Sequence, residues 1–201
     1  MPLSPMLWGY RTMSKILDEG NLKFDFTAYD TVEKFDDKNK KAHGLQAVDF
    51  IAETQGCLYF IEVKDFQNPG SPPNQRKKDI KKLRIDKNKN KQTKASVKFS
   101  LEMGGKIKDS LLRQYAEGYK FQKKVMYLLI INLNRLGSYE RIQIYGKGGL
   151  SDSIKGHVPT GLNDNTRFGD FTEISFNLII VDLAKAGQSQ TEKDIIVQRI
   201  L

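Results

Sequence analysis

Three polar side chains, Asp49, Glu62 and Lys64, stand in two segments that otherwise have the composition of buried strands. If Gln55 and Gly56 form the turn of a hairpin, Asp49 lies directly across from Glu62. Opposed residues share a face of the sheet with Cβ atoms about 4.5 to 5.5 Å apart, and Lys64, two residues beyond Glu62, projects from that face as well. The spacing therefore predicts two carboxylates and an amine in one place.

Two opposed acids destabilise a strand pair unless something neutralises them. A divalent cation would do so, since Mg²⁺ prefers oxygen ligands at about 2.0 to 2.1 Å and is usually held by one or two carboxylates together with substrate phosphate. The pattern thus favours a Mg²⁺ or Mn²⁺ site. The alternative is an ordinary edge strand, in which Glu62 and Lys64 form an ion pair and Asp49 merely ends a strand.

The apolar residues around these three argue against an edge strand. The predicted register places one set of residues on the first face: Val48, Phe50, Ile61 and Val63. It places a second set beside the charged residues: Ala47, Ile51, Leu58 and Phe60. Strands that are apolar on both faces are typical of the centre of a sheet covered by helices, where an unpaired charge is least tolerated. Glu53 shares the charged face but lies close to the turn, so we expect it to be solvated.

At these residues the sequence resembles the PD-(D/E)XK nuclease superfamily, which has the restriction-endonuclease-like fold. The matching pieces are Asp49, twelve intervening residues, and Glu62-Val63-Lys64, with Val48 in the place of the superfamily's proline. The resemblance implies that Asp49 and Glu62 bind the metal, that the Val63 backbone carbonyl is a further ligand, and that Lys64 lies beside the attacking water. It implies a catalytic trio of Asp49, Glu62 and Lys64.

The resemblance also implies an activity and a fold. The activity is metal-dependent hydrolysis of phosphodiester bonds, in DNA more than in RNA, in restriction, repair or defence. The fold is an α+β protein with an αβββαβ core, in which helices flank a central mixed β-sheet. Many superfamily members are dimers, so a homodimer is compatible with the resemblance. The alternative function is a non-catalytic module that retains the fold and binds nucleic acid or protein.

Residues on two other segments are further candidates. Superfamily members often bring an acid from the first helix to the metal, and Glu19 is the candidate here, although surface acids are common and an exposed acid near a helix end is the simpler interpretation. Gln114, followed by Tyr119, is similar to a glutamine-tyrosine element of RecB-type nucleases, so Gln114 is a candidate substrate contact while Tyr119 is expected in the core. Lys106 and Lys108 could meet phosphate, but lysines on a helix surface are more often solvated.

Positive charge is concentrated in one stretch of the chain. The 201 residues include 33 Lys or Arg against 24 acids, for a net charge of +9 and a pI near 9.4. Residues 76–94 alone hold ten Lys or Arg and two Asp. This segment could contact a phosphate backbone, or it could simply be a solvated loop. The candidate nucleic-acid contacts in it are Lys77, Lys78, Lys81, Lys82 and Arg84.

Length and composition favour a single domain, 1–201, with a basic loop or insertion at 68–94. One cysteine, Cys57, excludes an internal disulfide and agrees with a reducing cytoplasm, and its apolar setting predicts core packing. The longest apolar run, 125–131, is too short to span a bilayer. We therefore expect a cytoplasmic protein with no membrane partner.

Other chemistries find little support. His43 and His157 are isolated and lack cysteine partners at zinc-ligand spacing. No serine lies in a nucleophile-elbow sequence, and the glycines at 146–149 lack the Walker pattern.

The remaining patterns predict elements in a definite order. A helix follows Ser14, with Gly20-Asn21 as its stop, and a second helix covers about 95–120, with Ile107, Leu111, Tyr115 and Tyr119 as its apolar stripe and an interruption at Gly104-Gly105. Strands are expected at 22–26, 29–35, 125–132, 141–145 and 176–181, with the hairpin at 45–66. A loop is expected at 146–170 and a final helix at 191–201. This order of elements matches the αβββαβ core.

Overall fold

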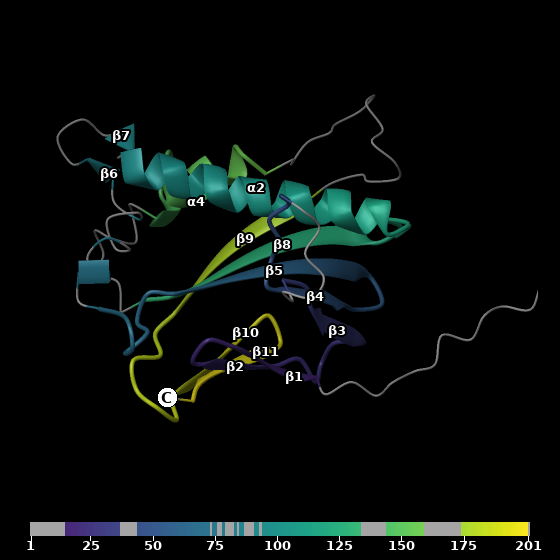
Figure 1. The fold of residues 1–201 in the computed structure, drawn as a ribbon, viewed down its shortest axis with the longest axis horizontal. Helices are drawn as coiled ribbons and strands as arrows, with labels where there is room; N and C mark the ends of the chain where they lie inside the picture. The colour runs from purple at the N-terminus through teal and green to yellow at the C-terminus, as the bar shows by residue number, and fades with distance from the viewer. Residues whose placement is uncertain are drawn as a thin grey trace, which may run out of the picture.

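The structure, a computed structural model, describes residues 15–36, 44–72, 74–75, 78, 83, 85–86, 91–92, 94–133, 144–158 and 174–200. They form three layers (Figure 1). A five-stranded mixed sheet lies between the long helix α2 (Lys94–Ala116) on one face and a four-stranded sheet on the other. The general prediction of a mixed α/β protein is therefore confirmed, but a second sheet, rather than helices, covers the other face.

The five-stranded sheet contains the predicted hairpin at its centre. Its spatial order is β3 (Thr31–Lys34), β4 (Phe50–Glu53), β5 (Cys57–Asp65), β8 (Lys124–Asn132) and β9 (Ile174–Val181). The first three strands are antiparallel neighbours, whereas β5, β8 and β9 run parallel. A parallel connection needs a crossover, which α2 supplies between β5 and β8.

The predicted hairpin register is confirmed. Phe50 pairs with Ile61, and Glu53 pairs with Leu58, so the same register carries Asp49 opposite Glu62. One face assignment was wrong, because Val48 packs with the helix-side core instead of beside Phe50. The alternation fails there since β4 begins only at Phe50, and the Val48 N–H donates to Ser110 Oγ of α2 at 3.0 Å.

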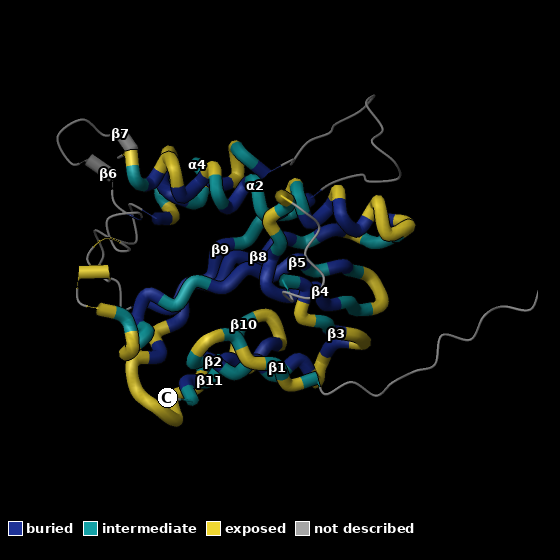
Figure 2. The backbone as a smooth tube through the Cα atoms, in the orientation of Figure 1, coloured by how far each residue is buried: buried dark blue, intermediate teal, exposed yellow. Residues whose placement is uncertain are grey.

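Alternate side chains of the central strands contribute to two separate hydrophobic cores. Phe60 and Leu129 point toward the helices, where they pack with Met103 and Ile107 of α2. Ile61 and its neighbours on the opposite face pack against the four-stranded sheet, in a core rich in aromatic rings: Phe24, Phe26, Tyr29 and Phe50. Figure 2 shows that burial is densest along the middle sheet. Strands buried on both faces explain the almost continuous apolar sequence of β8.

The four-stranded sheet includes both segments that were predicted to be helical, together with the strand predicted at 22–26, which is confirmed. Its order is β1 (Ile16–Glu19), β2 (Leu22–Asp25), β11 (Ile195–Arg199) and β10 (Ser189–Glu192). The predicted helix stop Gly20-Asn21 is instead the two-residue turn between β1 and β2, with Gly20 at φ 58°. The final hairpin turns at Lys193 and Asp194, which both have positive φ, as a tight two-residue turn requires.

Helix α2 is continuous through the two glycines that were predicted to interrupt it. Gly104 is the point of closest approach to the segment after α4 (Leu150–Lys155), because a Cβ added there would lie 2.5 Å from the Cβ of His157. The predicted stripe is correct at Ile107 and Leu111, but Tyr115 is exposed and the helix ends before Tyr119.

Of the remaining predictions of strands and loops, some are confirmed and others are wrong. The strand predicted at 176–181 is confirmed as β9. Of the strand predicted at 141–145, Ile144 and Tyr145 lie in a helical turn and the other three residues lie outside the described part. The loop predicted at 146–170 contains α4, where Leu150 and Ile154 are buried against the helix-side core.

A buried ion pair joins the two sheets at the carboxyl end of β5. Arg199 of β11 is fully buried and donates two hydrogen bonds to Asp65, at 2.6 and 2.8 Å. Asn132, at the end of β8, donates to the same carboxylate at 2.8 Å and accepts from the Leu183 N–H at 2.8 Å. These bonds fix the final hairpin to the five-stranded sheet.

Most of the basic stretch 76–94 lies outside the described residues, including Lys77, Lys81, Lys82 and Arg84. Lys78 is exposed, and two short strands, β6 (Ile85–Asp86) and β7 (Lys91–Gln92), pair within the stretch. Among the described residues, no helix has both the length and the apolar composition needed to cross a bilayer.

Candidate metal and phosphate site

The β4–β5 hairpin places Glu62 on the side of the middle sheet that faces α2, where Lys106 contacts it, and Asp49 lies directly before β4. Asp49 is 5% exposed and Glu62 is fully buried. Asp49 Oδ2 accepts a hydrogen bond of 2.6 Å from the backbone N–H of Val63, the residue after Glu62. The two carboxylates are close enough for the charge of Glu62 to act on Asp49. The predicted juxtaposition of two acids is therefore present.

Two ammonium groups hold one oxygen of Glu62. Lys64 Nζ lies 2.8 Å from Glu62 Oε1, and Lys106 Nζ of α2 lies 2.6 Å from the same atom. The other oxygen, Glu62 Oε2, has no hydrogen-bond partner within the part of the chain that the structure describes. A buried carboxylate oxygen without a partner is costly, so this atom has capacity for a further ligand.

The environment favours the neutral form of Asp49. Burial, followed by the charge of Glu62, raises the pKa of the Asp49 carboxyl to about 8, and Glu19 adds to this effect, while Lys106 and the Val63 N–H act in the opposite direction. Without a cation, the group is therefore largely protonated at neutral pH. A cation that binds Asp49 must displace this proton.

Lys64 keeps its charge in the same site. Its burial acts to lower the pKa of the ammonium group, but the attraction and hydrogen bond of Glu62 act in the other direction, and the net pKa is raised. Glu102 of α2 adds to this effect, with its Oε1 at 3.6 Å from Lys64 Nζ. Lys64 is thus a fixed positive charge beside Glu62.

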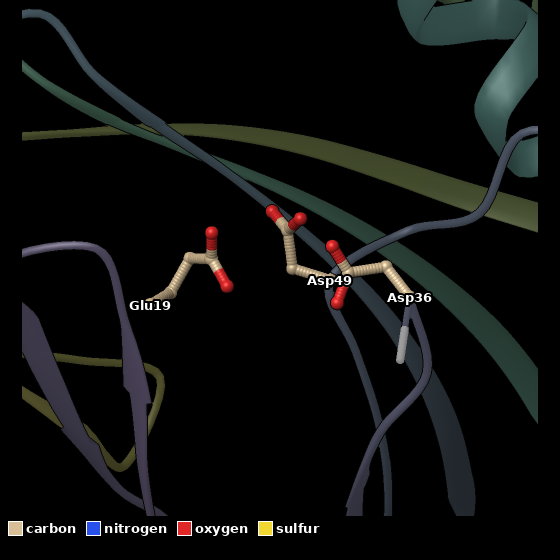
Figure 3. A group of neighbouring side chains, drawn as sticks. All are labelled: Glu19, Asp36 and Asp49. Carbon is tan, nitrogen blue, oxygen red and sulfur yellow. The ribbon is translucent and has the colours of Figure 1, made fainter. Parts of the chain in front are cut away.

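Asp49 also belongs to a group of three neighbouring acids (Figure 3). One carboxylate oxygen each of Glu19, Asp36 and Asp49 lies within 4.8 Å of the others. Glu19 comes from the end of β1 and Asp36 follows β3, so both sheets contribute. Glu19 Oε2 also lies 2.8 Å from Lys34 Nζ. Three oxygen donors in this spacing fit a hard cation such as Mg²⁺.

The structure thus brings four of the predicted site residues together and adds others. Asp49, Glu62, Lys64 and Glu19 all lie at this site, although Glu19 comes from a strand and not from a helix. Val63 contributes its N–H to Asp49, and its carbonyl as a metal ligand stays a prediction. Gln114 lies on the buried face of α2, about two turns beyond Lys106.

Sequence reasoning missed one residue and misplaced two. Lys106 was expected to be solvated but pairs with Glu62, 44 residues away in sequence. Asp36 was not among the candidates, although its position directly after a predicted strand was an available signal. Glu53 was expected in solvent but is bound by Lys123 at 2.7 Å and by Tyr119 at 3.2 Å.

The structure describes three of the four other residues that the sequence analysis considered. His157 packs against Gly104, and His43 lies outside the described residues. Cys57 is a half-buried free thiol at the start of β5, at the other end of the strand from Lys64. Lys108 is exposed on α2.

Comparisons with known proteins give no relative: no family model matches the chain, and searches of curated proteins and of solved structures find no match. The function is therefore argued from the site itself.

Proposed function

We propose that this protein is a nuclease that hydrolyses phosphodiester bonds, of DNA in preference to RNA, with Mg²⁺ or Mn²⁺ as cofactor. The observation that carries the proposal is the opposition of Asp49 and Glu62 in a buried hairpin with the ammonium of Lys64 bound to the second acid. Buried acids need compensation, and the two lysines bind only one oxygen of one of them.

The order and direction of the strands support membership of the PD-(D/E)XK nuclease superfamily. The antiparallel strands β3, β4 and β5 are followed by α2 and then by β8, parallel to β5. This order matches the βββαβ part of the core that the resemblance implies, which supports the proposal. Where the sequence predicted a helix after Ser14, the described residues form β1, so the additional acid, Glu19, reaches the site from a strand.

The donor set assigns a role to each acid. Glu19, Asp36 and Asp49 would hold the cation, with the open oxygen of Glu62 as a further ligand. When bound, such a cation lowers the pKa of a coordinated water and polarises the phosphate. Lys64, charged and mostly buried, would orient the attacking water or stabilise the negative charge that develops on the phosphate oxygens.

An activity screen tests the proposal. Single-stranded, duplex and branched DNA and RNA are incubated with the protein and Mg²⁺ or Mn²⁺, with a chelator in parallel. We expect cleavage that requires the cation and that falls at least about 100-fold in Asp49→Asn or Lys64→Met. Lys108→Met, which removes an exposed lysine charge from α2, is the matched control for Lys64→Met and should cleave normally. Undiminished turnover in Asp49→Asn would reject the proposal.

A second candidate, a binding module without catalysis, is favoured by one observation. Lys64 and Lys106 already neutralise Glu62, so the ion pairs could serve stability alone. Such a protein would bind nucleic acid with an affinity that falls steeply with salt. It would show no cleavage with any cation, and Lys64→Met would lower its stability but not an activity.

A further inference from the structure

The two lysines on Glu62 are an unusual arrangement, because both bind the same oxygen. Lys64 comes from β5, two residues away on the same strand, whereas Lys106 comes from α2 across the helix-side core. Lys106 makes the shorter contact, 2.6 Å against 2.8 Å, and its side chain is only 17% exposed. Two like charges are therefore held close together around a single buried acceptor atom.

Glu62 can balance only one of these two positive charges. A single carboxylate carries one negative charge, and Lys64 can be balanced by Glu102, which lies 3.6 Å away on its other side. Lys106, by contrast, has Glu62 as its ion-pair partner at the site. The arrangement is stable while Glu62 is the strongest anion within reach of Lys106.

We propose that Lys106 is the internal counter-ion of Glu62, and that it leaves Glu62 for a backbone phosphate of bound nucleic acid when a divalent cation binds nearby. The cation would lie among Glu19, Asp36 and Asp49. This inference rests on the proposed function of the site. It makes Lys106 a phosphate-binding residue and makes binding of the cation and binding of the nucleic acid mutually reinforcing.

The physical argument follows from charge. A divalent cation near Asp49 and Glu62 repels both ammonium groups and competes with them for the carboxylate. The lysine on α2 is not tied to the strand that carries Glu62, so it can move away while Lys64 keeps its place beside Glu102. A phosphate group at the cation then offers the displaced ammonium a new anionic partner. Binding of each ligand thereby favours binding of the other.

Two binding measurements on the whole protein test the proposal. The first is calorimetric titration with Mn²⁺ in the absence of nucleic acid. The second is fluorescence anisotropy of a labelled DNA duplex, measured in EDTA and in Ca²⁺, with the DNA checked for integrity afterwards. The variants are Lys106→Met, the conservative Lys106→Arg, and the control Lys108→Met, which removes the same charge from an exposed position on α2.

We expect Lys106→Met to bind Mn²⁺ severalfold more tightly than the wild type, because it removes a competing cation. Its DNA affinity should gain much less from Ca²⁺ than that of the wild type, for which we expect a gain of about tenfold. Lys106→Arg and Lys108→Met should behave as the wild type in both measurements. A lysine that only stabilises the fold would give the opposite sign for Mn²⁺, since a loosened site binds cations more weakly.

Three results would overturn the inference: Mn²⁺ binding by Lys106→Met that is no tighter than that of the wild type, an unchanged Ca²⁺ gain in that variant, or a wild type that binds no Mn²⁺. The last of these rejects the proposed function as well. A wild type that binds Mn²⁺ and DNA without cleaving rejects only the proposed nuclease activity, since the two binding measurements still decide the role of Lys106.

Discussion

The buried carboxyl of Asp49 makes a quantitative prediction about stability and pH. In the folded protein its pKa is about 8, against an ordinary value of 3.8. The unfolded chain therefore releases this proton near pH 4, whereas the folded chain, without a cation, keeps it until about pH 8. Between these two values the folded state binds more protons than the unfolded state, so this group lowers stability as the pH rises.

The magnitude follows from the two pKa values. Each pKa unit is worth about 1.4 kcal/mol, so ionised Asp49 lowers the free energy of unfolding by up to about 6 kcal/mol above pH 8. Relaxation and water entry around a buried charge reduce such costs. We therefore expect a measured effect of about 2 to 5 kcal/mol.

Asp49→Asn isolates this effect. The substitution keeps the shape of the side chain and an oxygen that can accept from the Val63 N–H, but it removes the titration. Urea unfolding in EDTA, from pH 4 to pH 8.5, should show the variant gaining stability relative to the wild type as the pH rises. Comparing the two proteins at each pH cancels the other titrating groups.

Added Mg²⁺ provides a second arm of the same assay. The cation stabilises ionised Asp49 in the wild type, so the advantage of Asp49→Asn at pH 8 should shrink as Mg²⁺ is added. A stability difference between the two proteins that stays constant from pH 4 to pH 8.5 would refute the reasoning about burial. A stability difference that depends on pH but does not change when Mg²⁺ is added would refute only the cation site.

Two further predictions concern the fold. Gly104→Ala should lower the free energy of unfolding by about 1 to 3 kcal/mol, because the added methyl group meets His157 Cβ at 2.5 Å. Its control, Gly105→Ala, has no atom closer than 4.0 Å to the added methyl group and should be neutral or stabilising. Equal urea midpoints for the two variants would contradict the packing at Gly104. Arg199→Met should lower the free energy of unfolding by about 3 to 5 kcal/mol, since it leaves the largely buried charge of Asp65 without its cationic partner. A variant with the same thermal unfolding midpoint as the wild type would show that the ion pair does not join the sheets.

The sequence contained enough information for the centre of the sheet. Two strands separated by a short turn constrain each other, so the alternation of Ile51, Phe60 and Ile61 determines one register and places Asp49 opposite Glu62. The buried strand β8 was equally clear, because its apolar run continues for most of its length. These features depend on contacts that are local in sequence.

The errors arose where the partner is distant in sequence. The segment Ile16–Glu19 has four residues, too few to distinguish helical from strand periodicity, and its pairing through β2 with β11 joins the two ends of the described chain. The same holds for Ile195–Arg199. The contact between Lys106 and Glu62 depends on how α2 is rotated against the sheet, which packing of the whole core determines.

The pairing of β2 with β11 also affects when the site can form during synthesis. Strand β1, which carries Glu19, is held in the four-stranded sheet only through β2, and β2 in turn pairs with a strand near the end of the chain. Strand β11 must therefore be synthesised before the four-stranded sheet can hold Glu19 beside Asp49. A chain that has emerged only as far as β9 would lack the complete group of Glu19, Asp36 and Asp49, so we expect cation binding at these acids to appear only after β11 is available.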